Sequence, residues 1–136
     1  MKELVDALVR ARGWNRLVEV VRAHRKAWGY LIRLLYVEDE ALGWQAVEAC
    51  GRLMGALATS QPDVCREVVR RLLWALNEES GTAGRLVAPA VGEAIACAPE
   101  ILGDFADALV PALEEPYLQA GAAWAFGRIG QVRPDL

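Results

Sequence analysis

The chain has 136 residues, of which 54% are hydrophobic and 24% charged, and its formal net charge is −3. This composition is typical of one globular domain with a well-filled core, and it argues against disorder. The longest stretch without a charged residue, 116–127, is shorter than the ~18 to 20 residues of a membrane-spanning helix, and acids near the N-terminus do not fit a secretory signal, so we expect a cytoplasmic protein.

Apolar residues recur at helical spacing along the whole chain, and no pair of alternating runs joined by a hairpin turn predicts strands. Gly13 separates the first two helices, and Pro99 and Pro116 interrupt apolar runs. Two points stay open: residues 14–36 form either two helices or one kinked helix, and Pro89, which lacks a backbone N–H, either kinks its helix or lies near a late start. The expected helices span residues 2–12, 14–25, 27–36, 42–58, 63–77, 85–97, 102–113 and 117–130.

A short apolar motif centred on glycine occurs three times, around Gly51, Gly92 and Gly127. The intervals of 41 and 35 residues are close to the period of repeats built from helical hairpins. Such a stack of hairpins is typical of proteins that hold a partner on an extended surface. Each copy also has a glutamate 13 residues before the glycine, namely Glu38, Glu79 and Glu114.

The positions around each glycine separate into an apolar face and an outward stripe. Residues one, two, four and five before the glycine are apolar or small, which predicts close packing of neighbouring helices. Residues seven before, three before and one after it are spaced by four, so they follow one line on a helix. The predicted stripes are Trp44, Glu48 and Arg52; Arg85, Pro89 and Glu93; and Ala120, Trp124 and Arg128.

These motifs resemble HEAT-like repeats, the class often called phycobilin-lyase-type. Residues 72–81 and 88–95 are similar to small bacterial HEAT-like proteins of unassigned function, in which a Leu-Asn-x-Glu-Ser-Gly turn precedes an Ala-Pro-Glu segment, although Ala90 stands in place of that glutamate. The resemblance implies an all-α fold, a short right-handed α-α superhelix in a single domain. Its expected parts are an N-terminal helical cap at 1–26 and repeats at 27–62, 63–101 and 102–136.

Acidic and amide side chains gather in the predicted turns between helices. The favoured interpretation is that they cap the following helix and interact with its positive end. The alternative is an acidic ridge that attracts a cation or a basic partner segment. The residues concerned are Glu38, Asp39, Asn77, Glu78, Glu79, Glu114 and Glu115.

No arrangement of residues predicts catalysis. The single histidine, His24, lies among basic residues, and neither a Gly-x-Ser-x-Gly elbow nor a phosphate-binding glycine loop occurs. Cys50, Cys65 and Cys97 are far apart without a CxxC pair, which favours reduced, mostly buried thiols and no metal site. We expect no enzymatic activity and no cofactor.

Tryptophan is enriched at binding hot spots, so Trp44 and Trp124 on the stripes are candidate contacts, with partial burial against a neighbouring hairpin as the alternative. Trp74 follows an apolar run and is expected in the core. We therefore expect a HEAT-like scaffold for protein–protein interaction that binds an unknown protein through Trp44, Glu48, Arg52, Arg85, Glu93, Trp124 and Arg128. The alternative is an accessory or chaperone-like subunit of an enzyme, of the lyase type.

Charge is distributed unevenly along the chain. Residues 1–33 carry eight Lys/Arg and three acids, a balance of +5, whereas residues 34–136 carry seven and fifteen, a balance of −8. Nucleic-acid binding is nevertheless the least favoured function, because the stripes mix both signs of charge. The apolar C-terminal end predicts self-association. The N-terminal basic residues are Arg10, Arg12, Arg16, Arg22, Arg25, Lys26 and Arg33.

Overall fold

The computed structural model describes residues 1–77 and 84–136, which contain helices and no strand, as the sequence predicts. No helix in this part of the chain is long and apolar enough to cross a bilayer. The α-helices are α1 (Lys2–Ala11), α2 (Trp14–Ala23), α3 (Ala27–Arg33), α4 (Glu40–Leu57), α5 (Pro62–Leu76), α6 (Val87–Cys97), α7 (Pro99–Leu102) and α8 (Gln119–Val132), and the 3-10 helices are η1 (Leu34–Tyr36) and η2 (Gly103–Glu114).

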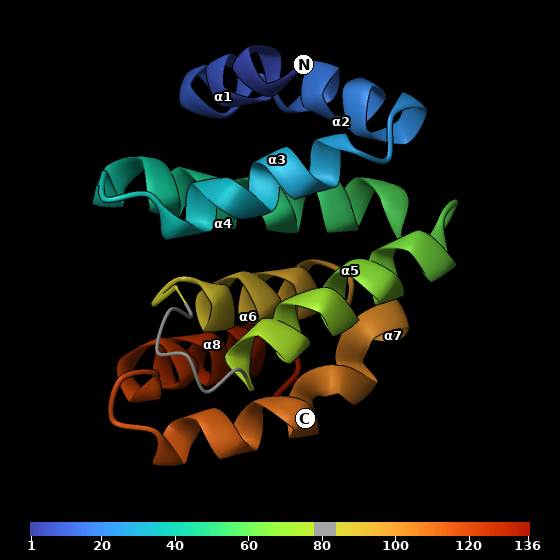
Figure 1. Ribbon diagram of the computed structural model, residues 1–136. Coiled ribbons are helices and arrows are strands. Elements are labelled where there is room, and N and C mark those ends of the chain that lie inside the picture. Colours follow the sequence, from blue (N-terminus) through green and yellow to red (C-terminus); the bar gives the residue numbers. More distant parts are fainter. Residues whose placement is uncertain (78–83) are drawn as a thin grey trace.

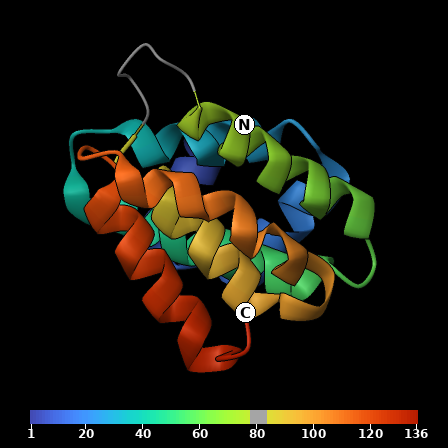
Figure 2. The same ribbon diagram turned by 90° about the horizontal axis from the view of Figure 1, so that it is seen from below.

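The helices are stacked in layers, with the two chain ends at opposite ends of the stack (Figure 1). α2 packs on α4, α4 on α6 and α6 on α8, so these helices form one row through the molecule. α5 packs against α6, and η2 packs against α6 and α8. The buried apolar side chains of all layers form one continuous core. Figure 2 shows α8 and η2 at the face nearest the viewer, where no other helix covers them.

Glycines allow α6 to lie very close to both of its neighbours in the row. A Cβ atom on Gly43 of α4 would lie 2.4 Å from Leu86 Cδ1, and one on Gly51 would lie 2.5 Å from Glu93 Cγ. On the other side of α6, a Cβ atom on Gly92 would lie 2.5 Å from the Cβ of Ala125 in α8. The motif glycines of the first two copies therefore sit at contacts between layers. A larger residue would displace the side chains of Glu93 and Cys97 at Gly51, and the backbone of α8 at Gly92.

The open question about Pro89 is answered by the start of α6. This helix begins at Val87, so Pro89 lies in its first turn, where the missing N–H has no partner to lose. Its predicted outward position is wrong, because Pro89 is buried. It packs against Gly121 of α8, where an added Cβ would lie 3.0 Å from Pro89 Cδ. The other open point is also resolved, since His24 is extended (φ −133°, ψ 98°) and separates α2 from α3.

The helix expected at 102–113 is not one regular α-helix. The chain forms α7 and then continues as the 3-10 helix η2 through Glu114. Pro111 lies inside η2 and cannot donate the backbone hydrogen bond that an α-helix needs there. At the junction, the Arg66 guanidinium donates to both carboxylate oxygens of Asp104 (2.8 Å each) and to the Ile101 carbonyl (2.7 Å), which ties α5 to this segment.

Trp74 is not in the core as expected, because its side chain is 71% exposed. The buried residues of α5 are Cys65, Val68, Val69 and Leu72. Successive helical residues are about 100° apart, so a position two after Leu72 points away from the buried face.

The two environments of the motif glycine lead to opposite expectations for the same substitution. Gly92→Ala brings Cβ against both the Cβ and the backbone Cα of Ala125 (2.5 and 2.6 Å), so we expect a loss of about 1–3 kcal/mol in the free energy of unfolding. Gly127→Ala meets nothing within 4 Å, and alanine favours the helix, so we expect a gain of up to about 1 kcal/mol. Urea unfolding followed by circular dichroism measures both, and equal effects would contradict the described packing of α6 on α8.

Candidate functional site

An open cleft of about 660 Å³ lies along α4, α6 and α8. Glu48, Arg52, Glu93 and Arg128, which the sequence assigns to the outward stripes, all line it. The structure therefore brings four predicted residues from three helices into one place. The lining is completed by Gly51, Gly55 and Cys97.

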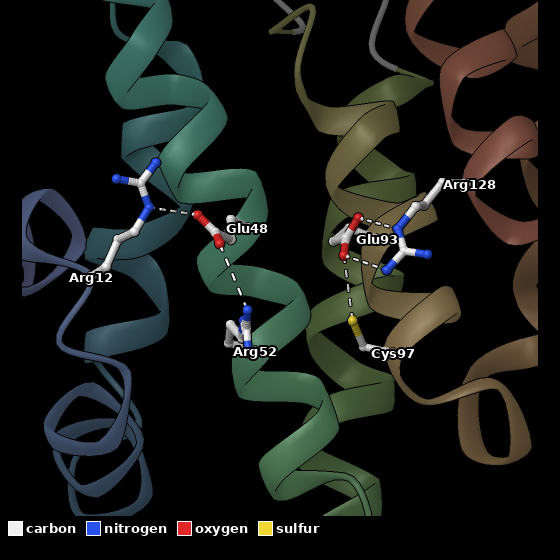
Figure 3. A network of polar contacts seen from close by, with 6 residues as sticks. All are labelled: Arg12, Glu48, Arg52, Glu93, Cys97 and Arg128. Atoms are coloured by element: carbon white, nitrogen blue, oxygen red, sulfur yellow. Dashed lines mark hydrogen bonds and ion pairs between the residues drawn. The ribbon is translucent and has the colours of Figure 1, made fainter. Parts of the chain in front are cut away.

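On the α4 side of the cleft, Glu48 lies between two arginines, Arg12 and Arg52 (Figure 3). Arg12 Nε donates to Glu48 Oε1 at 3.0 Å. Arg12 is the residue that ends α1, and its left-handed backbone (φ 53°) turns the chain there. Arg52 Nη2 lies 3.9 Å from Glu48 Oε2, too far for a hydrogen bond, and the Arg52 side chain is 60% exposed. The Arg52 guanidinium therefore retains donors that can reach a ligand.

Glu93 and Arg128 form a closer pair across α6 and α8. Arg128 donates from Nε to Glu93 Oε2 (2.9 Å) and from Nη2 to Glu93 Oε1 (3.2 Å), so the pair is bidentate. The Glu93 side chain is only 14% exposed. The Cys97 thiol donates to Glu93 Oε1 at 3.4 Å (Figure 3). The Glu93 carboxylate is thus hydrogen-bonded by both Arg128 and Cys97, and these three side chains form a rigid side of the cleft.

The three cysteines are free thiols, and Cys50 and Cys65 are buried. Burial raises the pKa of Cys50 to about 12 and that of Cys65 to about 11. Burial, together with the Glu93 carboxylate, raises the pKa of Cys97 to about 11, although Arg128 and Arg52 act in the opposite direction. At neutral pH the cleft thiol is therefore protonated, which makes it a poor nucleophile.

Trp44 of α4 and Trp124 of α8 pack edge to face, with ring centroids 5.0 Å apart and an interplanar angle of 61°. Each lies one helical turn before a charged residue of the cleft, Glu48 or Arg128. Their side chains remain 36% and 39% exposed. The indoles thus cover one another in part and still present an aromatic surface on the same helices as the cleft.

Arg85 is a predicted site residue that does not line the cleft. It precedes α6, and its Nη2 lies 3.4 Å from Glu40 Oε1 at the start of α4. This ion pair joins two layers on the exposed surface, where such pairs add little stability.

The acidic turns follow the capping interpretation in one case. Asp39 precedes α4 and accepts a hydrogen bond from Leu42 N at 3.2 Å. Among the described residues no side chain caps α8, so Glu114 and Glu115 do not have the expected capping role there. The η1–α4 and η2–α8 turns lie on the same side of the stack (left in Figures 1 and 2). Asn77 ends α5, and Glu78 and Glu79 lie outside the described residues.

Two of the N-terminal basic residues are paired with carboxylates. Arg10 pairs with Asp6 at 2.5 Å, and Arg12 pairs with Glu48, so two of these charges are already neutralised. His24 is exposed. Within residues 1–77 and 84–136, no group of three or more histidine, cysteine, aspartate or glutamate side chains is arranged to hold a metal ion.

Sequence reasoning missed three contributors to the cleft, Arg12, Gly55 and Cys97. Two of them carried a usable signal. Gly55 follows Gly51 by four residues, and Cys97 follows Glu93 by four, so each extends a line already recognised. Arg12 had none, because its contact with Glu48 spans 36 residues and depends on how α1 sits on α4.

Comparison of the chain with protein-family models, with curated proteins and with solved structures gave no match. The resemblance to HEAT-like repeats therefore depends on the residues quoted above.

The geometry around Cys97 predicts how its thiol reacts. At pH 8 a thiol with a pKa of about 11 is only ~0.1% thiolate, so we expect slow alkylation by iodoacetamide in the native protein. Glu93→Gln removes a negative charge beside the sulfur and lowers the Cys97 pKa, so alkylation of Cys97 accelerates. Peptide mass spectrometry distinguishes Cys97 from buried Cys65, whose pKa is raised by burial alone and which serves as the internal control. An unchanged Cys97 rate in the variant would contradict the contact with Glu93.

Proposed function

We propose that this chain is a HEAT-like repeat protein that binds a segment of another protein in the cleft between α4, α6 and α8. The observation that carries the proposal is the set of four charged side chains, two of each sign, around one open cleft of about 660 Å³. The exposed indoles on α4 and α8 extend the same surface.

The layered arrangement supports the HEAT-like part of the proposal. The row α2, α4, α6 and α8 runs through successive layers, and equivalent motif glycines, Gly51 and Gly92, mediate two successive contacts in it. In a repeat protein each unit contacts mainly its neighbours, and an extended surface results. We propose that the repeats are hairpins in a right-handed superhelix, with residues 1–26 as the cap.

The mixture of charges favours a polypeptide partner. A polyanion would be attracted by Arg52 and Arg128 but repelled by Glu48 and Glu93, whereas a peptide can present a carboxylate to Arg52 and a cation to Glu48. Gly55 is exposed and lacks a side chain, so a partner segment can approach the α4 backbone at this position. The tryptophans supply apolar area at low entropic cost.

A pull-down from the native host with mass spectrometry tests this function through a matched pair of variants. Arg52→Glu reverses an exposed charge in the cleft, and Arg70→Glu makes the same change on α5, where Arg70 lies near Glu67 (3.5 Å). We expect wild type and Arg70→Glu to recover the same partner, and Arg52→Glu to recover at least about tenfold less, since a charge-assisted contact contributes on the order of 1.5 kcal/mol or more.

Equal recovery by Arg52→Glu and Arg70→Glu would contradict a role for the cleft. Trp124→Ala and Trp74→Ala form a second pair, because Trp74 is an exposed tryptophan on α5 outside the cleft. If Trp124→Ala loses the partner and Trp74→Ala retains it, the binding surface includes the indoles of α4 and α8. Recovery of a coloured or cofactor-bearing enzyme would instead favour the accessory-subunit alternative.

We also propose self-association through α8. Its outward side carries Gly127 and Gly130, at which an added Cβ would meet nothing within 4 Å, and Trp124, about one turn before Gly127, is also exposed. Light scattering across a range of concentrations tests this, and we expect the mass to rise towards that of a dimer. Gly127→Leu projects a side chain from this face and should lower the association. A monomeric mass at every concentration would overturn the proposal.

A further inference from the structure

A second hollow, of about 300 Å³, lies between the start of α3 and α5, two helices that do not contribute a lining residue to the cleft. It has the composition of an anion site, because no carboxylate among the described residues lines it. Its lining residues are Arg25, Lys26, Gly29, Tyr30, Arg33 and Arg71. From these residues we infer that the hollow binds a small molecule through a diphosphate group.

The four cations of this hollow are available to a ligand. None of them forms an ion pair with a carboxylate in the described parts of the chain. Asp63 and Glu67 line an adjoining hollow together with Arg25 and Arg71, yet they make no ion pair with these two arginines. This concentration of unpaired positive charge is unusual in a chain whose net charge is −3. Like charges held together repel one another, so an anion between them relieves that repulsion.

The structure holds these side chains around the hollow from two segments that are far apart in the sequence. Arg25 and Lys26 precede α3, and their carbonyls accept hydrogen bonds from Trp28 N (3.2 Å) and Gly29 N (3.1 Å), which fixes this turn. Arg71 reaches the hollow from α5. The turn of α3 therefore faces a guanidinium from another layer.

Two further contacts define the inside of the hollow. Gly29 leaves the space open, because a Cβ atom there would already lie 3.5 Å from Arg71 Nη2. The Arg33 guanidinium lies over the Tyr30 ring, 5.5 Å from its centroid, and this stacking restricts where Arg33 points. Arginine forks bind phosphate oxygens in bidentate fashion, and three of the four cations are arginines.

Charge and size together identify the ligand class. One phosphate monoester carries about −1.5 to −2 at neutral pH, so a single phosphate leaves roughly half of the four positive charges unbalanced, and two phosphate groups match them. A hollow of about 300 Å³ lies at the lower end of the range for small-molecule sites. The mixed charges of the α4–α6–α8 cleft do not provide such a site, so this proposal does not depend on the function proposed for that cleft.

Isothermal titration calorimetry with inorganic pyrophosphate tests the assignment, with inorganic phosphate as the comparison. We expect saturable binding of one pyrophosphate per chain, and at least about tenfold weaker binding of phosphate, because fewer charges are matched. Arg71→Gln should weaken pyrophosphate binding at least about tenfold. The matched control is Arg70→Gln, which removes the same charge from the neighbouring position of α5 outside the hollow and should change the affinity less than about twofold.

A variant that fills the hollow distinguishes binding in a shaped site from general electrostatic attraction of pyrophosphate to the basic surface. Gly29→Leu keeps all four cations but fills the space beside Arg71, so it should abolish pyrophosphate binding while circular dichroism and the unfolding midpoint show an intact fold. Equal weakening by Arg70→Gln and Arg71→Gln, or undiminished binding by Gly29→Leu, would overturn the site. Absence of saturable pyrophosphate binding would overturn it as well. A short RNA duplex that binds more tightly than pyrophosphate and depends on Arg71 would replace the small ligand by nucleic acid.

Discussion

The close approach of α6 to its two neighbours is the constraint on which the other features depend. Gly43 and Gly51 on one side, and Gly92 with Ala125 on the other, allow the backbones to come together where ordinary side chains would hold them apart. Dispersion forces fall steeply with distance, so this approach strengthens the contact between layers over its whole length. It also brings charged residues of three helices into reach of one another, which separate helices would not do.

The two arginines of the cleft have different tasks for this reason. Arg128 is committed to Glu93 by two hydrogen bonds and spans the α6–α8 contact, where both groups are largely withdrawn from water. Replacing one partner of such a pair leaves the other without compensation. Arg52 projects from α4 into solvent and has only a distant carboxylate beside it. The first arginine therefore belongs to the architecture, and the second is free to contact a ligand.

Much of the fold was readable from the sequence because helical periodicity is local. The expected helices at 42–58 and 85–97 agree closely with α4 (Glu40–Leu57) and α6 (Val87–Cys97). The same periodicity placed Glu48, Arg52, Glu93 and Arg128 on one surface. The prediction for Trp74 was wrong because it followed from the apolar character of the side chain. The helical periodicity itself places Trp74 about 200° from Leu72, away from the buried face of α5.

Other features could not be read from the sequence because they depend on contacts between distant segments. Arg71 is separated from Arg25 by 46 residues, and their guanidinium groups reach one hollow only because of how α5 lies relative to α3. The junction of α7 and η2 is similar, because Arg66 of α5 donates to the Ile101 carbonyl of α7 and to the Asp104 carboxylate of η2. Periodicity describes a helix face but does not specify which neighbour the face meets.

The edge-to-face contact of Trp44 with Trp124 joins helices that are separated by α6. Two indoles at this distance couple their electronic transitions, and the coupling produces a paired band of opposite signs in far-ultraviolet circular dichroism. The amplitude of that band depends on the separation and orientation of the rings. The amplitude of this band therefore reports changes in the distance or angle between α4 and α8, without an attached label.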